Sequence, residues 1–541
     1  MSITKGPSAG PSRAEDPIRA ELFGPERLEQ HAESLAAADR VTEKLSRGRD
    51  LLPRVRDNGR VLFERYHSSV EAVGAKREIT LAEEWFLDNF HVVDEQLREI
   101  RDHLPKAYSR QLPKIAAGHL AGTPRVYGLA WAYVAHTDSH FELQTLERFV
   151  QAYQRVDPLS IGELWALPIH LRMVLVENLR RLSQQVTDSR EARAQADELA
   201  DRLLGLSGRP VATSEEVLHP LDDAPLTRAF AVQLIQRLRD QQALITPALE
   251  WLNRRLAAQG TSPGEVVAEE HHAQGAATAT VRNIISSMRW MSSIDWLEFF
   301  EKVSPVDDVL RRASAFGAMD FATRDEYRNQ VEMLSRNSES SEIEVARAAV
   351  LLAQNALESG VSGNKSQLPG SPERAEADPG FYLLAKGRRD FERQLGFRAP
   401  LLLRLRRVLR AYGIAAYLGG IAAITVLQLC GLLFVAGFAG AALWSTLSLV
   451  LLGVVPAAEI AVSLVHRLVA VVMPPKTLPK LELAQGIPPE LRTLVVVPTL
   501  LTRLSDLEEQ LERLEVHYLA NPEGHLHFAL VTDWADAPYC E

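Results

Sequence analysis

The longest uncharged stretch of the sequence limits what this chain can fold into. No Asp, Glu, Lys or Arg occurs between Arg410 and Glu459, a run of 48 positions in a chain of which 24% is charged. One helix of that length would reach about 72 Å, more than twice the ~30 Å hydrocarbon core of a bilayer. We therefore predict two spans, residues 413–436 and 441–464, joined by a turn that contains Gly437 and Gly440. The alternative, a buried hairpin in a soluble protein, requires a very large surrounding core that the polar flanks do not offer.

The basic residues around this run predict its orientation. Nine Lys or Arg residues and only two acids lie between Phe381 and Arg410, and Arg467, Lys476 and Lys480 follow the second span. Because cytoplasmic flanks of membrane helices carry the excess of Lys and Arg, both termini are expected in the cytoplasm. Residues 381–410 are further interpreted as a basic amphipathic pre-membrane segment that meets anionic lipid.

The region before the membrane segment is expected to be all helical. Residues 1–17 have the Gly, Ser and Pro content of a disordered N-terminus, and residues 359–380 that of a flexible linker. Between them, residues 18–358 form the predicted helical cytosolic domain, because apolar residues return at helical spacing. Proline residues are expected to end its helices at ordinary lengths, at Pro105, Pro113, Pro124, Pro158, Pro168, Pro210 and Pro220.

Three groups of polar residues are candidate functional sites, and a purely structural interpretation is favoured for each. Adjacent side chains in Glu269–His272 diverge by about 100° on a helix, which favours a solvated face over a metal site. The stretch His136–His140 contains two His and one Asp, yet a loop with a helix cap explains it more simply. Glu459, with His466 on the same face, is interpreted as a carboxylate near the interface; a polar path through the membrane is the alternative.

After residue 490 the pattern changes from helix to strand, helix and strand. Arg492–Leu501 is a β-branched apolar run typical of a buried parallel strand. Ser505 and Glu508 predict a capping box at the start of the next helix, and His525–Asp533 predicts a second strand. Two parallel strands and one helix form a βαβ unit, which is too small to bury a sheet. Residues 490–541 are therefore expected to be the incomplete beginning of an α/β domain.

Ligands of such units gather beyond the carboxyl ends of the strands, where Thr499, Asp533 and Asp536 lie in the sequence. An aspartate at a strand end can accept hydrogen bonds from a nucleotide base or ribose. Asp is also common there for capping alone, so the position by itself is a weak indication of a site.

Several stretches, in order along nearly the whole chain, resemble the bacterial cyclic β-1,2-glucan synthases. They include EEWFLDNFHVVDEQLREIRDHLPKAYSRQLPKIA from Glu83, PRVYGLAWAYVAHTDSHF from Pro124, AMDFATRDEYRNQVE from Ala318, and LVVVPTLL and HLHFALVTDWADAP near the end. The resemblance implies an amino-terminal portion of a large inner-membrane enzyme that ends just inside an inverting, UDP-glucose-dependent glycosyltransferase domain of the nucleotide-diphosphosugar fold. Thr499, Asp533 and Asp536 would then hold the uracil and ribose.

The resemblance also determines which cofactors and partners are expected. The complete enzyme would use Mg or Mn with UDP-glucose and make β-1,2-glucan, whereas no cofactor and no catalytic residue is expected within this chain. The net charge of -10 gives no general attraction for nucleic acid, and the lipid bilayer is an expected partner. Self-association of the chain is left open. The alternative function is a non-enzymatic membrane scaffold whose helical cytosolic domain binds a partner.

Overall fold

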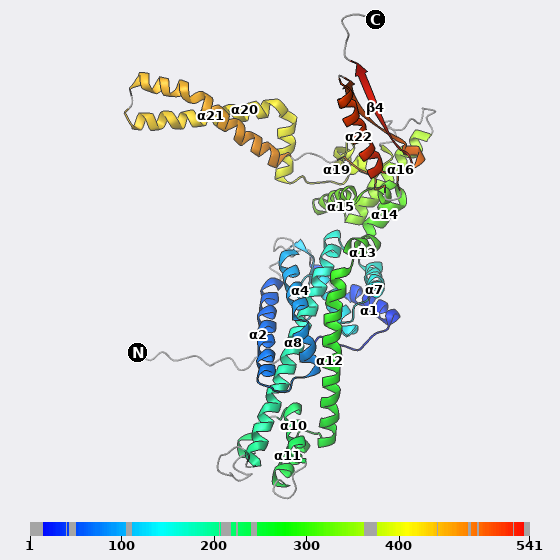
Figure 1. Ribbon diagram of the computed structural model, residues 1–541, viewed down its shortest axis with the longest axis vertical. Coiled ribbons are helices and arrows are strands. Elements are labelled where there is room, and N and C mark those ends of the chain that lie inside the picture. Colours follow the sequence, from blue (N-terminus) through cyan, green and yellow to red (C-terminus); the bar gives the residue numbers. More distant parts are fainter. Residues whose placement is uncertain are drawn as a thin grey trace, which may run out of the picture. The chain divides into compact units, whose positions relative to one another are not determined.

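The computed structural model describes residues 15–38, 41–42, 50–103, 111–204, 206, 218–222, 226–239, 246–361, 376–440, 442–473, 478–483, 486–501, 503–522 and 524–534. The described part is mainly helical, as predicted. It forms two compact units, Met1–Pro305 and Val306–Glu541, whose elements are labelled in Figure 1.

The first unit is a helical bundle with one minimal pair of strands. Its helices are α1 (Pro25–Ala38), α2 (Leu51–Gly74), α3 (Leu81–Asp88), α4 (Phe90–His103), α6 (Arg125–His136), α7 (Leu143–Val156), α8 (Ile161–Leu203), α10 (Arg228–Arg239), α11 (Thr246–Ala258), α12 (Pro263–Ser293) and α13 (Trp296–Val303), with the short 3₁₀ helix η1 (His219–Leu221). Strand β1 (Val41–Thr42) pairs antiparallel with β2 (Lys114–Ile115).

Helix α8 is the centre of this unit and packs against α2, α4, α6, α10 and α12. It begins at a capping box formed by Ser160 and Glu163 and continues for 43 residues, so the prediction that Pro168 ends a helix is wrong. A proline inside a helix costs about 3 kcal/mol. The segment Leu164–Leu179 is buried on nearly every side, and each fully buried Leu or Val contributes about 1.5–3 kcal/mol. Packing therefore outweighs the local preference.

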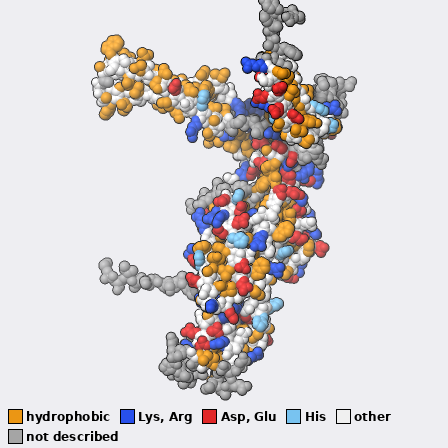
Figure 2. Space-filling model, in the orientation of Figure 1, with side chains coloured by type: hydrophobic (Ala, Val, Ile, Leu, Met, Phe, Trp, Pro, Cys, Tyr) orange, Lys and Arg blue, Asp and Glu red, His pale blue; other side chains and the backbone are white. Residues whose placement is uncertain are grey.

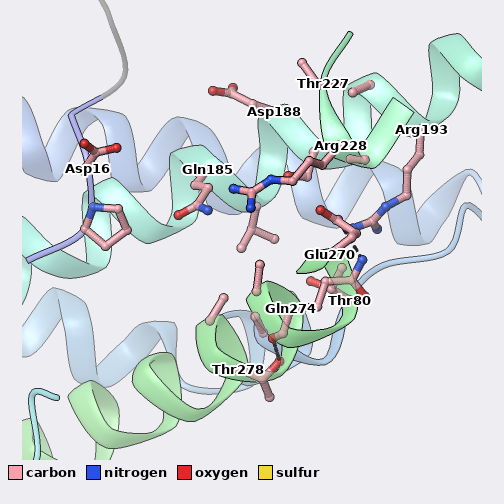
Figure 3. A pocket seen from close by; sticks show the side chains of 18 of the residues that line it. Asp16, Thr80, Gln185, Asp188, Arg193, Thr227, Arg228, Glu270, Gln274 and Thr278 are labelled. Atoms are coloured by element: carbon pink, nitrogen blue, oxygen red, sulfur yellow. Dashed lines mark hydrogen bonds and ion pairs between the residues drawn. The ribbon is translucent and has the colours of Figure 1, made fainter. Parts of the chain in front are cut away.

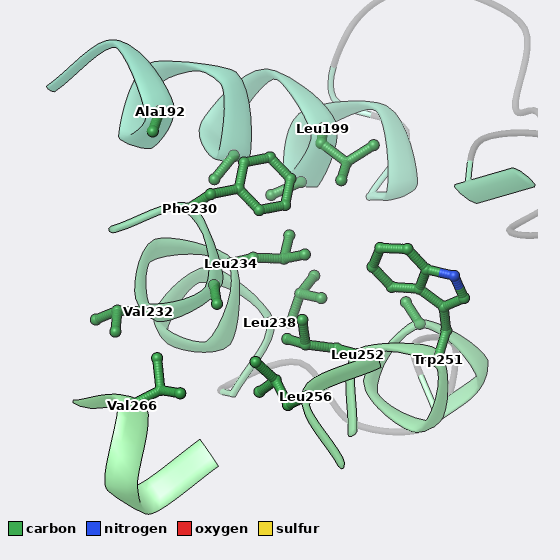
Figure 4. Packing of buried hydrophobic residues seen from close by; sticks show 14 of the residues in the cluster. Ala192, Leu199, Phe230, Val232, Leu234, Leu238, Trp251, Leu252, Leu256 and Val266 are labelled. Atoms are coloured by element: carbon green, nitrogen blue, oxygen red, sulfur yellow. The ribbon is translucent and has the colours of Figure 1, made fainter. Parts of the chain in front are cut away.

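The carboxyl-terminal end of α8 packs with α10, α11 and α12 around a separate apolar cluster, shown in Figure 4. Phe230 and Leu234 of α10 lie between α8 and Trp251 of α11. The indole nitrogen of Trp251 donates a 2.6 Å hydrogen bond to Asp222, so the N–H of this buried ring is satisfied. This cluster holds the far end of the bundle together.

A buried carboxylate links α8 to α2. Glu177 accepts hydrogen bonds from Arg54 at 2.5 and 2.9 Å, from Asn58 at 2.6 Å and from Arg181 at 2.8 Å. Burial by itself would raise the pKa of Glu177, but these donors hold the pKa well below its usual range. The carboxylate is therefore ionised wherever the bundle is folded near neutral pH.

The second unit contains a small polar module, a long hairpin and a strand–helix–strand segment. Its elements are α14 (Pro305–Ala313), η2 (Ala315–Ala318), α15 (Phe321–Arg336), α16 (Glu342–Val361), α18 (Pro379–Leu383), α19 (Arg388–Gln394), α20 (Leu401–Phe438), α21 (Leu443–Val472), η3 (Pro489–Leu491), β3 (Thr493–Leu501), α22 (Leu504–Ala520) and β4 (Leu526–Trp534). We call the described residues of α14 to α19 the flanking module, because the sequence enters the hairpin directly after it.

Helices α20 and α21 form the hairpin, and both are long and apolar enough to cross a membrane. Figure 2 shows their surface covered almost entirely by hydrophobic side chains, in contrast to the mixed charges elsewhere. Gly413 interrupts α20 with φ +44° and ψ −115°, a conformation that side-chain-bearing residues avoid. The kink separates a first segment, Leu401–Tyr412, from the uncharged helix that follows.

Two polar groups pair across the hairpin. The hydroxyl of Tyr417 on α20 lies 2.7 Å from the Nε2 atom of His466 on α21, and the two rings are stacked. His466 is therefore directed to the neighbouring helix, while Glu459 is exposed on α21.

The final segment has two parallel strands joined by one helix, as the sequence predicts. The predicted capping box is wrong, because α22 starts two residues earlier, at Leu504, with Arg503 in the capping position. Ser505 consequently lies within the first turn, where its hydroxyl contacts Asp506 at 3.4 Å.

Candidate functional site

The predicted site residues lie at the carboxyl ends of the parallel strands. In the register of the pair, Thr499 is opposite Thr532, and Leu500 is opposite Asp533. Paired residues share a face of a sheet and successive residues alternate, so Thr499 and Asp533 belong to opposite faces. Asp536 lies outside the described residues.

Helix α22 covers only the face to which Thr499 belongs. Tyr518 of α22 contacts the ring of Phe528, which alternates onto that face, at a centroid distance of 6.4 Å. The other face carries Asp533 together with Leu494, Val496, Leu500 and Val531, and these apolar side chains are between 43% and 59% exposed. Asp533 is therefore reachable from the open face, whereas Thr499 is half-buried beneath the helix.

Of the four adjacent polar residues on α12, Glu269 and Glu270 point to different partners. Glu269 is exposed and pairs with Arg228 at 3.4 Å, whereas Glu270 is buried and pairs with Arg193 at 3.3 Å. The divergence expected from helical geometry is observed for these two carboxylates, and each has an arginine partner.

Residues 137–140 form a loop after α6, as interpreted from the sequence, but His136 is the last residue of that helix and the stretch does not cap the next one. Thr137 is the C-cap residue of α6, and α7 begins only after Glu142. Asp138 and Ser139 adopt positive φ angles of 49° and 61°. Asp138 accepts hydrogen bonds from Arg19, Thr280 and Asn283, so this carboxylate joins the chain's first described residues to α12.

A groove of about 250 Å³ lies between α8 and α12 in the first unit, and Figure 3 shows its lining. Gln185, Asp188 and Arg193 come from α8, and Gln274 and Thr278 come from α12. Burial raises the pKa of Asp188, although the nearby Arg65 opposes the shift. Hydroxyl, amide and charged groups line this groove, so it can hydrogen-bond a polar ligand; the sequence patterns did not single it out.

The chain returns to the flanking module directly after the hairpin, through a segment that we call the return segment, Leu478–Leu483. The backbone N–H of Asp320 donates to the carbonyl of Lys480 at 2.9 Å, and the N–H of Glu482 donates to the carbonyl of Ala318 at 2.8 Å. Met319 and Leu481 form the antiparallel bridge between these two bonds. Two main-chain hydrogen bonds thus hold the end of the hairpin to the start of α15.

The beginning of the hairpin is attached to the same module. Arg407 of α20 donates to both carboxylate oxygens of Glu392 on α19, at 2.6 and 2.7 Å. The backbone N–H of Arg398 donates to the carbonyl of Asn337 at 2.8 Å. Both ends of the uncharged hairpin are therefore joined to one polar body, an arrangement that no local motif predicts because the partners lie far apart in the sequence.

The described residues assemble no site for the divalent metal that the family resemblance implies. The sequence contains no D-x-D motif in its 541 residues. Within the described ranges, no group of three or more His, Cys, Asp or Glu side chains is arranged to hold a metal ion. Mg and Mn prefer several oxygen ligands, which these side chains do not assemble.

Comparison with known proteins shows what this chain is similar to. No protein-family model matches the chain. Over 551 aligned residues the chain is 34% identical to the cyclic beta-(1,2)-glucan synthase NdvB of Rhizobium meliloti (strain 1021). The match covers 99% of this chain but only 18% of that synthase, so the chain spans less than a fifth of the relative's length. The resemblance predicted from the sequence motifs is confirmed: almost all of this chain is similar to a portion of a cyclic beta-(1,2)-glucan synthase.

Proposed function

We propose that this chain is the membrane-anchoring part of a cyclic β-1,2-glucan synthase, and that it holds a UDP-glucose-dependent glucosyltransferase at the bacterial inner membrane. The main support is the attachment of both hairpin ends to the flanking module through Lys480 and Arg407. A folded polar module cannot be divided between the two sides of a bilayer. If α20 and α21 both span, their outer ends therefore lie on one side, and the basic flanks favour the cytoplasm.

The β3–α22–β4 segment is proposed to be part of the sugar-nucleotide-binding half of the transferase. Its parallel strands place Thr499 and Asp533 at the edge where α/β domains bind ligands. We assign contacts with the uracil and ribose to Thr499, Asp533 and Asp536. Because Thr499 and Asp533 belong to opposite faces, Asp533 is the stronger candidate for a direct contact from the open face.

Transfer itself is proposed to need residues that this chain does not supply. The D-x-D motif that would bind metal in the family is absent from the sequence, and no general base is assigned. The proposed role of the chain is therefore to anchor and position, with glucan as the product of the larger enzyme.

Two measurements on membranes that carry only this chain test the proposal. Alkaline carbonate should leave the chain in the membrane pellet, because two spanning helices are not extracted. Radiolabelled UDP-glucose should leave no label in a β-1,2 polymer. Extraction into the supernatant would refute the anchoring role. Polymer synthesis would refute the proposal that glucosyl transfer needs residues which this chain does not supply.

A further inference from the structure

The first segment of α20, Leu401–Tyr412, has two chemically different sides. On a helical wheel with about 100° per residue, Leu401, Leu405, Val408 and Tyr412 fall within about 60° of one another. These four side chains are 83%, 52%, 51% and 67% exposed, so each keeps at least half of its surface open among the described residues. The stripe is a continuous unpartnered apolar face.

The arginines of this segment occupy the rest of the wheel. Arg404 lies beside the apolar stripe, about 40° from its edge. Arg406 and Arg407 lie about 130° from its centre on the two sides, and Arg410 lies opposite it. Arg407 is held by both oxygens of Glu392 on α19. No ion pair is formed by Arg404, Arg406 or Arg410 within the described ranges, so three positive charges are left for a partner outside the chain.

The kink at Gly413 determines where this amphipathic segment can lie. The uncharged helix begins directly after the kink, so Leu401–Tyr412 starts at the end of a proposed membrane span. The non-helical φ and ψ of Gly413 allow the axis of this segment to differ in direction from the axis of the uncharged helix that follows. The segment is thus positioned at the level of the lipid headgroups.

We propose that Leu401–Tyr412 is an interfacial helix that binds anionic phospholipid and seats the flanking module on the membrane surface. The apolar stripe enters the acyl boundary, and Arg404 at its edge reaches lipid phosphates. Arg406 adds positive charge on the other side of the helix, and Arg407 joins the module through Glu392. A lipid surface, rather than a protein, is the chosen partner because the apolar face is continuous with the proposed membrane-spanning helix and every charged residue of the segment is an arginine.

This inference rests on the proposed membrane anchoring, and the experiment separates the two. The full chain, with Cys430 and Cys540 replaced by serine, is reconstituted in nanodiscs of phosphatidylcholine with about a third phosphatidylglycerol. A nitroxide is attached at Leu405→Cys, on the stripe, or at Ala411→Cys, which lies between Arg404 and Arg407 on the wheel. The Leu405 label should be more accessible to oxygen than to an aqueous nickel chelate, and the Ala411 label should show the reverse. A label inside the span, at Leu427→Cys, reports whether the hairpin is inserted.

Lipid selectivity tests the role of the individual arginines. Arg404→Gln should lower the preference for phosphatidylglycerol over phosphatidylcholine by about fivefold, and lysine at the same position should restore it. The matched control, Arg407→Gln with Glu392→Gln, should leave the preference unchanged, because that guanidinium is already paired.

The outcomes identify which claim fails. A water-accessible label at Leu427 would overturn the anchoring function itself. A buried label at Leu427 with a water-accessible label at Leu405 would overturn the interfacial helix alone. Equal loss of selectivity for Arg407 and Arg404 would overturn the assignment of separate roles to the arginines.

Discussion

The ion pair between Asp307 of α14 and Arg328 of α15 should control the stability of the flanking module. The two side chains are almost completely buried, with 0% and 1% exposed, and are joined by hydrogen bonds of 3.0 and 2.5 Å. The guanidinium carbon also lies 5.7 Å from the ring centroid of Phe316 and 5.6 Å from that of Phe321. Asp307→Asn keeps the shape of the side chain but removes the negative charge of this buried pair.

Breaking a buried pair in this way costs about 3–5 kcal/mol. At 1.4 kcal/mol per tenfold change, opening of the module should become more frequent by about two to three and a half decades. Amide hydrogen exchange of the full chain in detergent measures this directly on the peptides of α15. The protection factors of these amides should fall by the same factor, while peptides of α8 in the first unit keep theirs.

The matched control replaces both partners. Asp307→Leu with Arg328→Met removes the two charges together and fills a similar volume, so protection should return to within about tenfold of the original protein. Unchanged protection in Asp307→Asn would refute the reasoning, because the buried pair would then have lost its negative charge without cost. Equal damage in the double variant would show that shape, rather than charge pairing, holds the module together.

Three further predictions concern single positions. Burial lowers the pKa of His170 to about 4, although its Nδ1 contact with the carbonyl of Ala166 opposes the shift. The neutral ring therefore stabilises the first unit above pH 6.5, and this contribution should be lost as the pH falls from 6.5 to 4. Hydrogen exchange of α8 should accordingly depend less on acid in His170→Gln. Gly413→Ala places a side chain at φ +44°, which costs about 1–3 kcal/mol, so the kink should straighten and a label at Leu405 should become more accessible to water. Asp533→Asn should weaken UDP binding by the full chain at least fivefold in equilibrium titration, and an unchanged affinity would remove Asp533 from the proposed site.

The local sequence pattern was sufficient to predict the parts of the fold that depend on composition, such as the two apolar helices. The uncharged run predicted two apolar helices because a helix satisfies the backbone polar groups of a segment internally, which lipid requires. The turn is observed around Gly440, whose φ of +67° explains why a glycine is found there. Pro168 shows the limit of this reasoning, since its local cost is offset by neighbours that a single sequence does not reveal.

The geometry of the candidate site could not be predicted from one sequence. Thr499 and Asp533 were correctly expected near strand ends, but which face each occupies follows from the register of β3 with β4. A shift of one residue would exchange the faces of one strand relative to the other. The contact of Lys480 with Asp320 joins residues 160 positions apart through main-chain atoms, so no side-chain motif could have indicated it.

The most direct test of the central claim is the sidedness of three single cysteines in a full chain whose Cys430 and Cys540 are serine. Ala385→Cys lies before the hairpin, Ala439→Cys at its turn and Leu483→Cys after it. A membrane-impermeant maleimide should label positions 385 and 483 only in inside-out vesicles, and position 439 only in intact cells whose outer membrane has been permeabilised. Labelling of 385 and 483 from opposite sides would contradict the account, because the flanking module could not then hold both ends of the hairpin.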